Sequence, residues 1–167
     1  MLYDPSNPVV LLCVKGIETE YAGNIEKADG LYREAWSLAD TDLEKMTAAH
    51  YLARTRDNAA EALHWNLLAL DHAGKIEAGG TMAPEVAALY PSLHLNVAKS
   101  FEDGTNPEKA REHYLLAGQY TKDLPADGYG EMISKGIAAG LARIEAALAH
   151  DANRTTLVSK SNDDLRR

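Results

Sequence analysis

The stretch NPEKAREHYLLAGQY, residues 106–120, decides the fold of this chain, because two earlier stretches repeat its plan. Asn106 precedes Pro107, so its side chain can cap a helix whose first position holds a residue with a fixed φ angle and no N–H group. Ala110, Tyr114 and Ala117 then follow at helical spacing and lie on one face of that helix. Small residues on this face allow a neighbouring helix to approach closely.

The same spacing occurs twice upstream, at Asn24, Ala28, Tyr32 and Ala35, and at Asn58, Ala62, Asn66 and Ala69. Ala28 and Ala62 are 34 residues apart, whereas Ala62 and Ala110 are 48 apart, which is one period of 34 plus an insertion of 14. A period of this length indicates a helical repeat in which each unit is a hairpin of two helices. The predicted repeats cover about residues 8–40, 41–75 and 91–122, with the insertion at 74–90.

Local signals predict where the helices begin and end. Asn7-Pro8 and Asn58 should each cap a helix, and Thr41 with Glu44 should form the reciprocal capping box. Gly23 should end the first helix, because glycine adopts the left-handed conformation at little cost. Further boundaries are expected at a break at Gly79-Gly80, a short helix from Pro84, a kink or a fresh start at Pro91 and a turn at Gly104-Thr105.

Residues 127–149 are predicted to form one long helix that caps the array. Its apolar stripe can cover the end of the last hairpin, as terminal elements of repeat arrays must. The stripe consists of Ile133, Ile137, Leu141, Ile144 and Leu148. The expected fold is therefore an all-α, right-handed stack of three hairpins plus a C-terminal capping helix, an α-solenoid in one domain over residues 1–149. The polar tail, 150–167, receives no assignment.

Composition limits the classes of partner. The chain has 167 residues and a formal charge of −8, from 25 acidic and 17 basic side chains, so nucleic acid and anionic membranes would be repelled. Cys13 is the only cysteine, which excludes an internal disulfide and fits a reducing cytoplasm. The apolar run 9–14 is too short to span a membrane and has Asp4 before it, where a secretory signal would have Lys or Arg. We expect a cytoplasmic protein.

These features resemble tetratricopeptide repeats (TPR) over about residues 8–148. The residues that carry the resemblance are the second-helix pattern Ala-xxx-Tyr-xx-Ala, Gly16, Gly23, and Asn96-Val97-Ala98, where the family often has Asn-Leu-Gly. The sequence departs from the pattern in the first helices, where Leu12, Met46 and His94 replace an aromatic residue, and at Asn66.

The blocks NPVVLLC, TAAHYLAR, YPSLHLN and DGYGEMI are similar to those of small free-standing bacterial TPR proteins whose activity is unassigned. Some chains of this type carry the name rRNA adenine methyltransferase. Methyl transfer would require a Gly-rich strand-to-helix turn, and the sequence contains no GxGxxG. The residues therefore do not support that activity.

Because the sequence lacks the common catalytic and metal-binding patterns, we expect a protein that is not an enzyme and holds no cofactor or metal. The sequence contains no HExxH, no CxxC and no GxSxG, and its histidines are scattered over several predicted helices. Cys13 lies in an apolar helical stretch, where an inert buried thiol is expected.

The concave face of the stack is the candidate binding site. The first helices of the repeats should line it, and the residues expected to contact a partner are Tyr51, Arg54, Leu95, Asn96, Lys99 and Tyr129. The alignment places further residues on this face: Cys13, Ile17, Glu20, Thr55, Asp103 and Ile133. The predicted function is that of a non-catalytic scaffold that binds a protein or peptide segment in this groove.

Alternatives remain open at this stage. Arg54 and Lys99 could share one anionic group of a ligand, or could form surface ion pairs with Glu20, Glu102 or Asp103. A second function is a small-ligand sensor or cryptic enzyme that uses His50, Arg54 and Asn96. This function predicts that Tyr90, Tyr129 and the insertion close over the groove. Homo-oligomerisation through an exposed apolar face is a third hypothesis.

Overall fold

Asparagine side chains start the helices as the sequence predicts. The computed structural model of the protein describes residues 4–78 and 84–164, with the backbone alone for 84, 85 and 152–164. The side-chain oxygens of Asn7, Asn24, Asn58 and Asn106 accept hydrogen bonds from backbone N–H groups two or three residues later. Thr41 and Glu44 form the reciprocal capping box.

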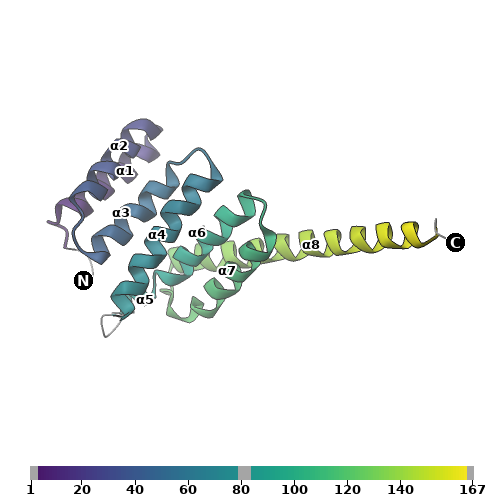
Figure 1. The fold of residues 1–167 in the computed structure, drawn as a ribbon. Coiled ribbons are helices and arrows are strands. Elements are labelled where there is room, and N and C mark those ends of the chain that lie inside the picture. The colour runs from purple at the N-terminus through teal and green to yellow at the C-terminus, as the bar shows by residue number, and fades with distance from the viewer. Residues whose placement is uncertain (1–3, 79–83, 165–167) are drawn as a thin grey trace.

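All regular secondary structure in the described residues is helical. Figure 1 shows the order of the elements. The helices are α1 (Pro8–Tyr21), α2 (Ile25–Leu38), α3 (Asp42–Arg54), α4 (Ala59–Ala78), α5 (Pro84–Ala87), α6 (Tyr90–Asp103), α7 (Pro107–Gln119) and α8 (Gly128–Asp164), with a 3-10 turn, η1 (Thr121–Asp123), before α8.

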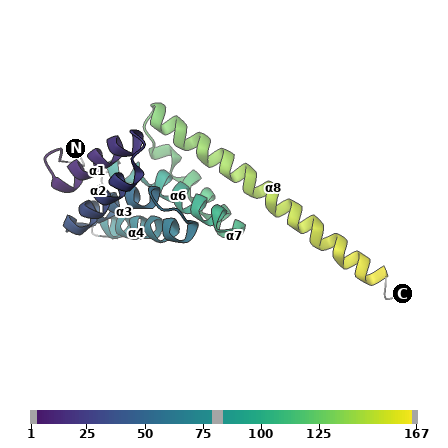
Figure 2. The ribbon, with the colours of Figure 1, turned by 90° about the horizontal axis from the view of Figure 1, so that it is seen from above.

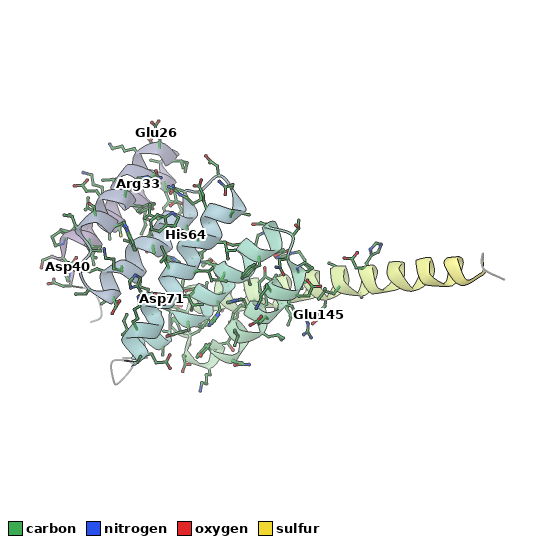
Figure 3. All side chains as sticks on the ribbon, viewed as in Figure 1. Glu26, Arg33, Asp40, His64, Asp71 and Glu145 are labelled. Carbon is green, nitrogen blue, oxygen red and sulfur yellow. The ribbon has the colours of Figure 1, made fainter. Side chains whose placement is uncertain are left out.

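Consecutive helices pack against one another in pairs. Short connections join α1 to α2, α3 to α4 and α6 to α7, and the two helices of each pair are in contact. Each pair meets the next through α2 and α3, through α4 and α6, and through α7 and α8. Figures 1 and 2 show the pairs side by side in chain order. Charged side chains such as Glu26, Arg33 and Asp71 lie on the exposed outer faces of α2 and α4 (Figure 3).

Small residues and two tyrosines form the contacts within and between the pairs. Ala28, Ala35, Ala69, Ala110 and Ala117 are completely buried, which confirms the close approach predicted from their spacing. Ala62 has the same spacing but is only partly buried, so the burial that this spacing predicts was wrong there. A side chain on the first helical turn of α4 lies near the end of the pair, where fewer atoms cover it.

The buried tyrosines lie against glycines. A Cβ atom added to Gly16 of α1 would lie 2.1 Å from the ring of Tyr32, and one added to Gly140 of α8 would lie 2.2 Å from the ring of Tyr114. Tyr32 and Tyr114 are both almost fully buried. Burying a side chain of this size contributes roughly 1.5–3 kcal/mol. The missing Cβ atoms of the two glycines therefore make room for the rings.

Much of the predicted insertion is helical. α4 continues through Ala78, and α5 starts at Pro84 as expected, whereas the predicted break at Gly79-Gly80 lies outside the described residues. Pro91 occupies the first turn of α6, where its missing N–H group has no helical partner to lose. Gly104 and Thr105 form the predicted turn, and Thr105 has a positive φ angle of 60°.

The C-terminal helix differs from its predicted extent. α8 runs from Gly128 to Asp164, so it continues through most of the tail that received no assignment. Its first half packs against α7 and α6, and its second half extends away from the other helices (Figures 1 and 2). The sequence signals for a helix end, glycine or proline, do not occur between residues 141 and 164, which explains the continuous helix.

Candidate functional site

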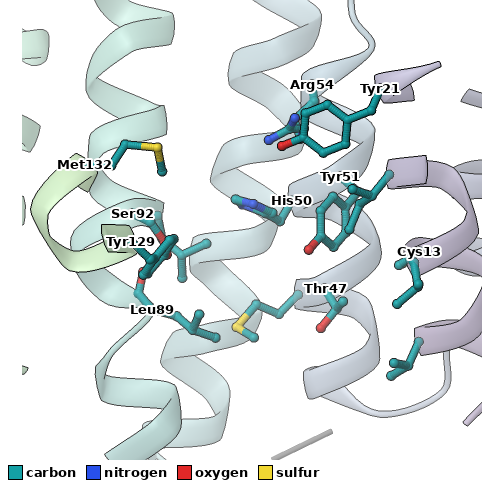
Figure 4. A pocket seen from close by; sticks show the side chains of 15 residues that line it. Cys13, Tyr21, Thr47, His50, Tyr51, Arg54, Leu89, Ser92, Tyr129 and Met132 are labelled. Atoms are coloured by element: carbon teal, nitrogen blue, oxygen red, sulfur yellow. The ribbon is translucent and has the colours of Figure 1, made fainter. Parts of the chain in front are cut away.

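A cavity of about 550 Å³ opens between α1, α3, α6 and the first turns of α8. Figure 4 shows Tyr129 and Met132 of α8 on one side of it, with Ser92 of α6 beside Tyr129, Cys13 and Tyr21 of α1 on the other side, and side chains of α3 between them. Volumes of this size are common for sites that bind small molecules or side chains. The residues that line it are Val10, Cys13, Val14, Ile17, Tyr21, Met46, Thr47, His50, Tyr51, Arg54, Leu89, Ser92, Leu93, Tyr129 and Met132.

Exposed apolar side chains surround the opening. Tyr21 is 81% exposed, Met132 59%, Val14 46% and Tyr129 39%. Deeper in the cavity, Cys13, Met46 and Leu93 are buried. Solvent-exposed apolar side chains that gather at one place, contributed by α1 and α8, are typical of surfaces that bind a partner.

The structure brings together some of the predicted contact residues. Tyr51, Arg54 and Tyr129 all line the cavity, as do Cys13 and Ile17 from the wider predicted face. Most of the apolar wall was not predicted from the sequence, including Val14, Met46, Leu93 and Met132. Met132 comes from a helix that was predicted as a cap, and the sequence alone does not show that its first turns line a cavity together with α1 and α3.

Three other predicted residues lie elsewhere. Leu95 packs against α8, where a Cβ atom added to Gly136 would be 3.2 Å away, because α8 covers this part of α6. Asn96 contacts His50, with 3.4 Å between its Nδ2 and the imidazole Nδ1. Lys99 forms an ion pair with Asp103, four residues later on α6.

The remaining residues of the predicted face have structural partners. Thr55 donates a hydrogen bond to Asp29 over 2.9 Å, and Asp103 is the partner of Lys99. Ile133 is buried in a cluster with Ala117 and Ile137, at the contact between α7 and α8. Thr55 and Ile133 join neighbouring helices, whereas the Asp103 ion pair lies within α6.

Arg54 is bound to a carboxylate of the chain itself. Its Nη2 lies 2.7 Å from Oε1 of Glu20, and its Nε lies 3.2 Å from Oε2, which makes the contact bidentate. The Tyr32 hydroxyl also donates to Glu20, over 2.9 Å. The hydrogen bond from Arg54 lowers the pKa of the Glu20 carboxyl and raises that of the guanidinium. Of the two arrangements left open for Arg54 and Lys99, the structure contains ion pairs with Glu20 and Asp103.

His50 lies at the centre of the cavity wall as a neutral imidazole (Figure 4). Burial, and then the nearby Arg54 charge, lower its pKa to about 4. The Asn96 Nδ2 group can only donate, so Nδ1 of His50 accepts and the ring proton resides on Nε2. No described residue is a hydrogen-bond partner of Nε2, and no described side-chain nitrogen is buried without one, so Nε2 is open to the cavity.

Cys13 is part of the cavity wall, and its thiol is expected to be unreactive. Its side chain is 2% exposed, and burial raises the pKa of the thiol to about 12. A thiolate is required for nucleophilic attack, and at neutral pH this sulfur carries its proton.

A pair of histidines, His94 and His113, lies between α6 and α7, away from the cavity. Nδ1 of His94 is 3.1 Å from Nδ1 of His113, and the His94 ring stacks on Tyr120. Over the described part of the chain, no group of three or more His, Cys, Asp or Glu side chains could hold a metal ion.

No described helix is both long enough and apolar enough to span a membrane.

Comparison of the chain with protein-family models, with curated proteins and with solved structures gives no match.

Proposed function

We propose that this chain is a non-catalytic scaffold of the TPR type that binds a segment of a partner protein across the cavity formed by α1, α3, α6 and α8. The observation that carries this proposal is the ring of exposed apolar side chains at the cavity mouth: Val14, Tyr21, Tyr129 and Met132. Contact of apolar side chains with water is unfavourable. A partner that covers them gains about 25 cal/mol of binding free energy for each Å² of apolar surface removed from water.

The TPR-type stack in this proposal is supported by a charge pattern in successive first helices. Glu20, Arg54 and Glu102 lie at corresponding positions near the ends of α1, α3 and α6, with spacings of 34 and 48 residues, and Arg143 lies in α8, 41 residues after Glu102. Arg54 pairs with Glu20, and Arg143 pairs with Glu102 over 2.8 Å. The Tyr32 and Tyr114 hydroxyls donate to these two glutamates. The recurrence supports a repeat in which α8 begins a fourth unit. A bacterial origin and a cytoplasmic location belong to the same proposal.

A selection from a displayed peptide library tests the proposal. The wild-type chain should enrich peptides that bind at micromolar concentrations. Val14→Glu with Met132→Glu should lose them, because the two carboxylates would lie on opposite sides of the apolar opening. The matched control is Leu67→Glu with Leu115→Glu, two exposed leucines of α4 and α7 outside the cavity. Peptides that bind both double variants equally would show that the segment binds elsewhere.

The second candidate is a small-ligand sensor or cryptic enzyme. Contact between His50 and Asn96 favours it, as does the presence of Tyr129 and of Leu89, from the insertion, in the cavity wall. Tyr90 does not close over the cavity as this alternative predicts. Its side chain is buried, stacks on Tyr120, and donates a hydrogen bond to Glu77 over 3.1 Å. The four exposed side chains at the opening fit a peptide better than a ligand that becomes enclosed.

A further inference from the structure

The electrostatics of the cavity restrict what it can bind. Arg54 is the one side chain with a full charge among the described residues that line it, and Glu20 already neutralises this guanidinium. The Cys13 thiol and the His50 imidazole are both uncharged at neutral pH. A carboxylate ligand would have to displace Glu20, and a cation would meet Arg54 without a free anion in the wall. The ligand group that enters this cavity should therefore be uncharged.

Two hydroxyl groups in the wall already donate hydrogen bonds to the backbone. The Thr47 hydroxyl donates to the Leu43 carbonyl over 2.7 Å, and the Ser92 hydroxyl donates to the Leu89 carbonyl over 2.8 Å. Both hydroxyl protons are therefore directed at the backbone. The Nε2–H group of His50 differs, since Asn96 engages only the other ring nitrogen. A donor in an apolar wall favours a ligand that supplies an acceptor there.

We propose that the cavity takes an uncharged apolar side chain of the partner segment, and that Nε2–H of His50 donates a hydrogen bond to a backbone carbonyl oxygen of the same segment. The inference rests on the proposed function and adds the chemistry of the anchor. Val10, Ile17, Met46 and Leu93 supply the apolar surface for that side chain. The hydrogen bond from His50 requires a partner segment in an extended or turn conformation, where the backbone carbonyl oxygen does not already accept a hydrogen bond.

The test uses blocked amino acids as probes, observed by NMR on the full-length protein. N-acetyl-phenylalaninamide and N-acetyl-leucinamide should shift the methyl signals of Ile17 and Met46 with millimolar affinity. The matched charged probes, N-acetyl-glutamate amide and N-acetyl-lysinamide, should bind at least about tenfold more weakly, the ratio given by 1.4 kcal/mol of desolvation. Equal or tighter binding of either charged probe at these methyl groups would overturn the inference.

The role of His50 is tested with a pair of variants. His50→Leu removes the donor and should weaken N-acetyl-phenylalaninamide about three- to tenfold, the range for one neutral hydrogen bond. His50→Gln keeps an N–H donor near the Nε2 position and should restore most of that affinity. Ethylbenzene, which lacks an acceptor, should bind wild type and His50→Leu within about twofold. Lys99→Ala, outside the cavity wall, is the control for each probe.

The outcomes separate this inference from the proposed function. If selected peptides bind at the cavity but prefer a charged anchor, or if His50→Leu weakens ethylbenzene as much as the amide, the inference fails and the scaffold function stands. If ethylbenzene enters the cavity but no peptide or blocked amino acid does, both proposals fail, and the hypothesis of a small-ligand sensor or cryptic enzyme replaces them. A change in the 15N shift of His50 Nε2 that occurs with the amide but not with ethylbenzene would support the hydrogen bond directly.

Discussion

The guanidinium of Arg54 binds the carboxylate of Glu20 in a bidentate contact, with 2.7 Å between Nη2 and Oε1, across a sequence separation of 34 residues. This separation is the repeat length inferred from the alanine spacing. The contact joins the last turns of α1 and α3, the two helices that form one side of the cavity. It neutralises the one fully charged side chain of the described cavity wall, and this neutralisation is one basis for the proposed uncharged ligand.

The Glu20–Arg54 pair is expected to contribute measurably to stability. The Glu20 side chain is only 17% exposed and the Arg54 side chain 40% exposed, so water screens this pair less than a fully exposed one. A double-mutant cycle with Glu20→Gln and Arg54→Met should give a coupling energy of about 1 kcal/mol by urea unfolding. The same cycle on Glu131 and Lys135, whose side chains are 71% and 78% exposed, should give under about 0.5 kcal/mol. Equal couplings would contradict the prediction.

Gly140 should tolerate no side chain. An added Cβ atom would lie 2.2 Å from two ring atoms of Tyr114, which is buried between α7 and α8. Gly140→Ala is therefore expected to lower the free energy of unfolding by roughly 1–3 kcal/mol, because the ring or the helix must move. Gly30→Ala is the control, since a Cβ atom there meets nothing within 4 Å. Gly30→Ala should stabilise α2 by roughly 0.5–1 kcal/mol through its helix propensity. Thermal unfolding of both variants decides the point.

Helix boundaries could be predicted because their signals are local. Each asparagine cap, the Thr41 and Glu44 box, and the Pro91 start depend on residues within one helical turn, and the structure confirms them. The end of α8 had no such signal, and its continuation to Asp164 was missed.

The composition of the cavity depends on contacts between distant elements, which spacing does not encode. Alignment of the repeats placed Leu95 on an open face, but α8 lies over α6 and covers it. The position of α8 depends on the connection formed by η1 and residues 124–127. The same connection brings Tyr129 and Met132 opposite α1. Arg54 and Lys99 could be predicted as face residues, whereas their carboxylate partners required the structure.

Cys13 should react slowly despite its place in the cavity wall. Because burial raises the pKa of its thiol to about 12, the reactive thiolate is scarce at pH 8. Alkylation by iodoacetamide, followed by mass spectrometry, should be about a hundredfold or more slower in the folded protein than in 8 M urea, at the same pH. The protein unfolded in urea serves as the internal control for reagent quality. Rapid alkylation of the folded chain would mean that the sulfur is ionised, and would reopen the enzyme hypothesis.

Stability should fall as the pH is lowered from about 6.5 towards 4, the window set by two histidines whose pKa values are lowered in the folded protein. Burial lowers the pKa of His50 and of His94 to about 4, and the neighbouring His113 adds to the effect on His94. In the unfolded chain these imidazoles bind protons near pH 6.5, whereas in the folded protein they stay neutral. The unfolded state therefore binds more protons, and the free energy of unfolding decreases by up to about 1.4 kcal/mol per pH unit for each histidine.

The carboxylates act in a separate, lower window. Hydrogen bonds from Asn7 to Glu44 and from Arg143 to Glu102 lower the pKa of each carboxyl to about 2. Their contribution to stability is present above the unfolded pKa near 4.3 and is lost as the pH falls towards 2. Loss of stability between pH 6.5 and 5 therefore reports the histidines and not these glutamates.

The pH dependence is measured by urea unfolding, followed by circular dichroism, at pH 7.5, 6.5, 5.5 and 4.5. His94→Phe keeps an aromatic ring against Tyr120 but cannot bind a proton, so its free energy of unfolding should fall less steeply below pH 6.5 than that of the wild type. His64→Phe, at an exposed position of α4, is the matched control and should follow the wild-type curve. A wild-type curve that stays flat between pH 7.5 and 5, or parallel curves for His94→Phe and the wild type, would show that these imidazoles already bind protons in the folded protein.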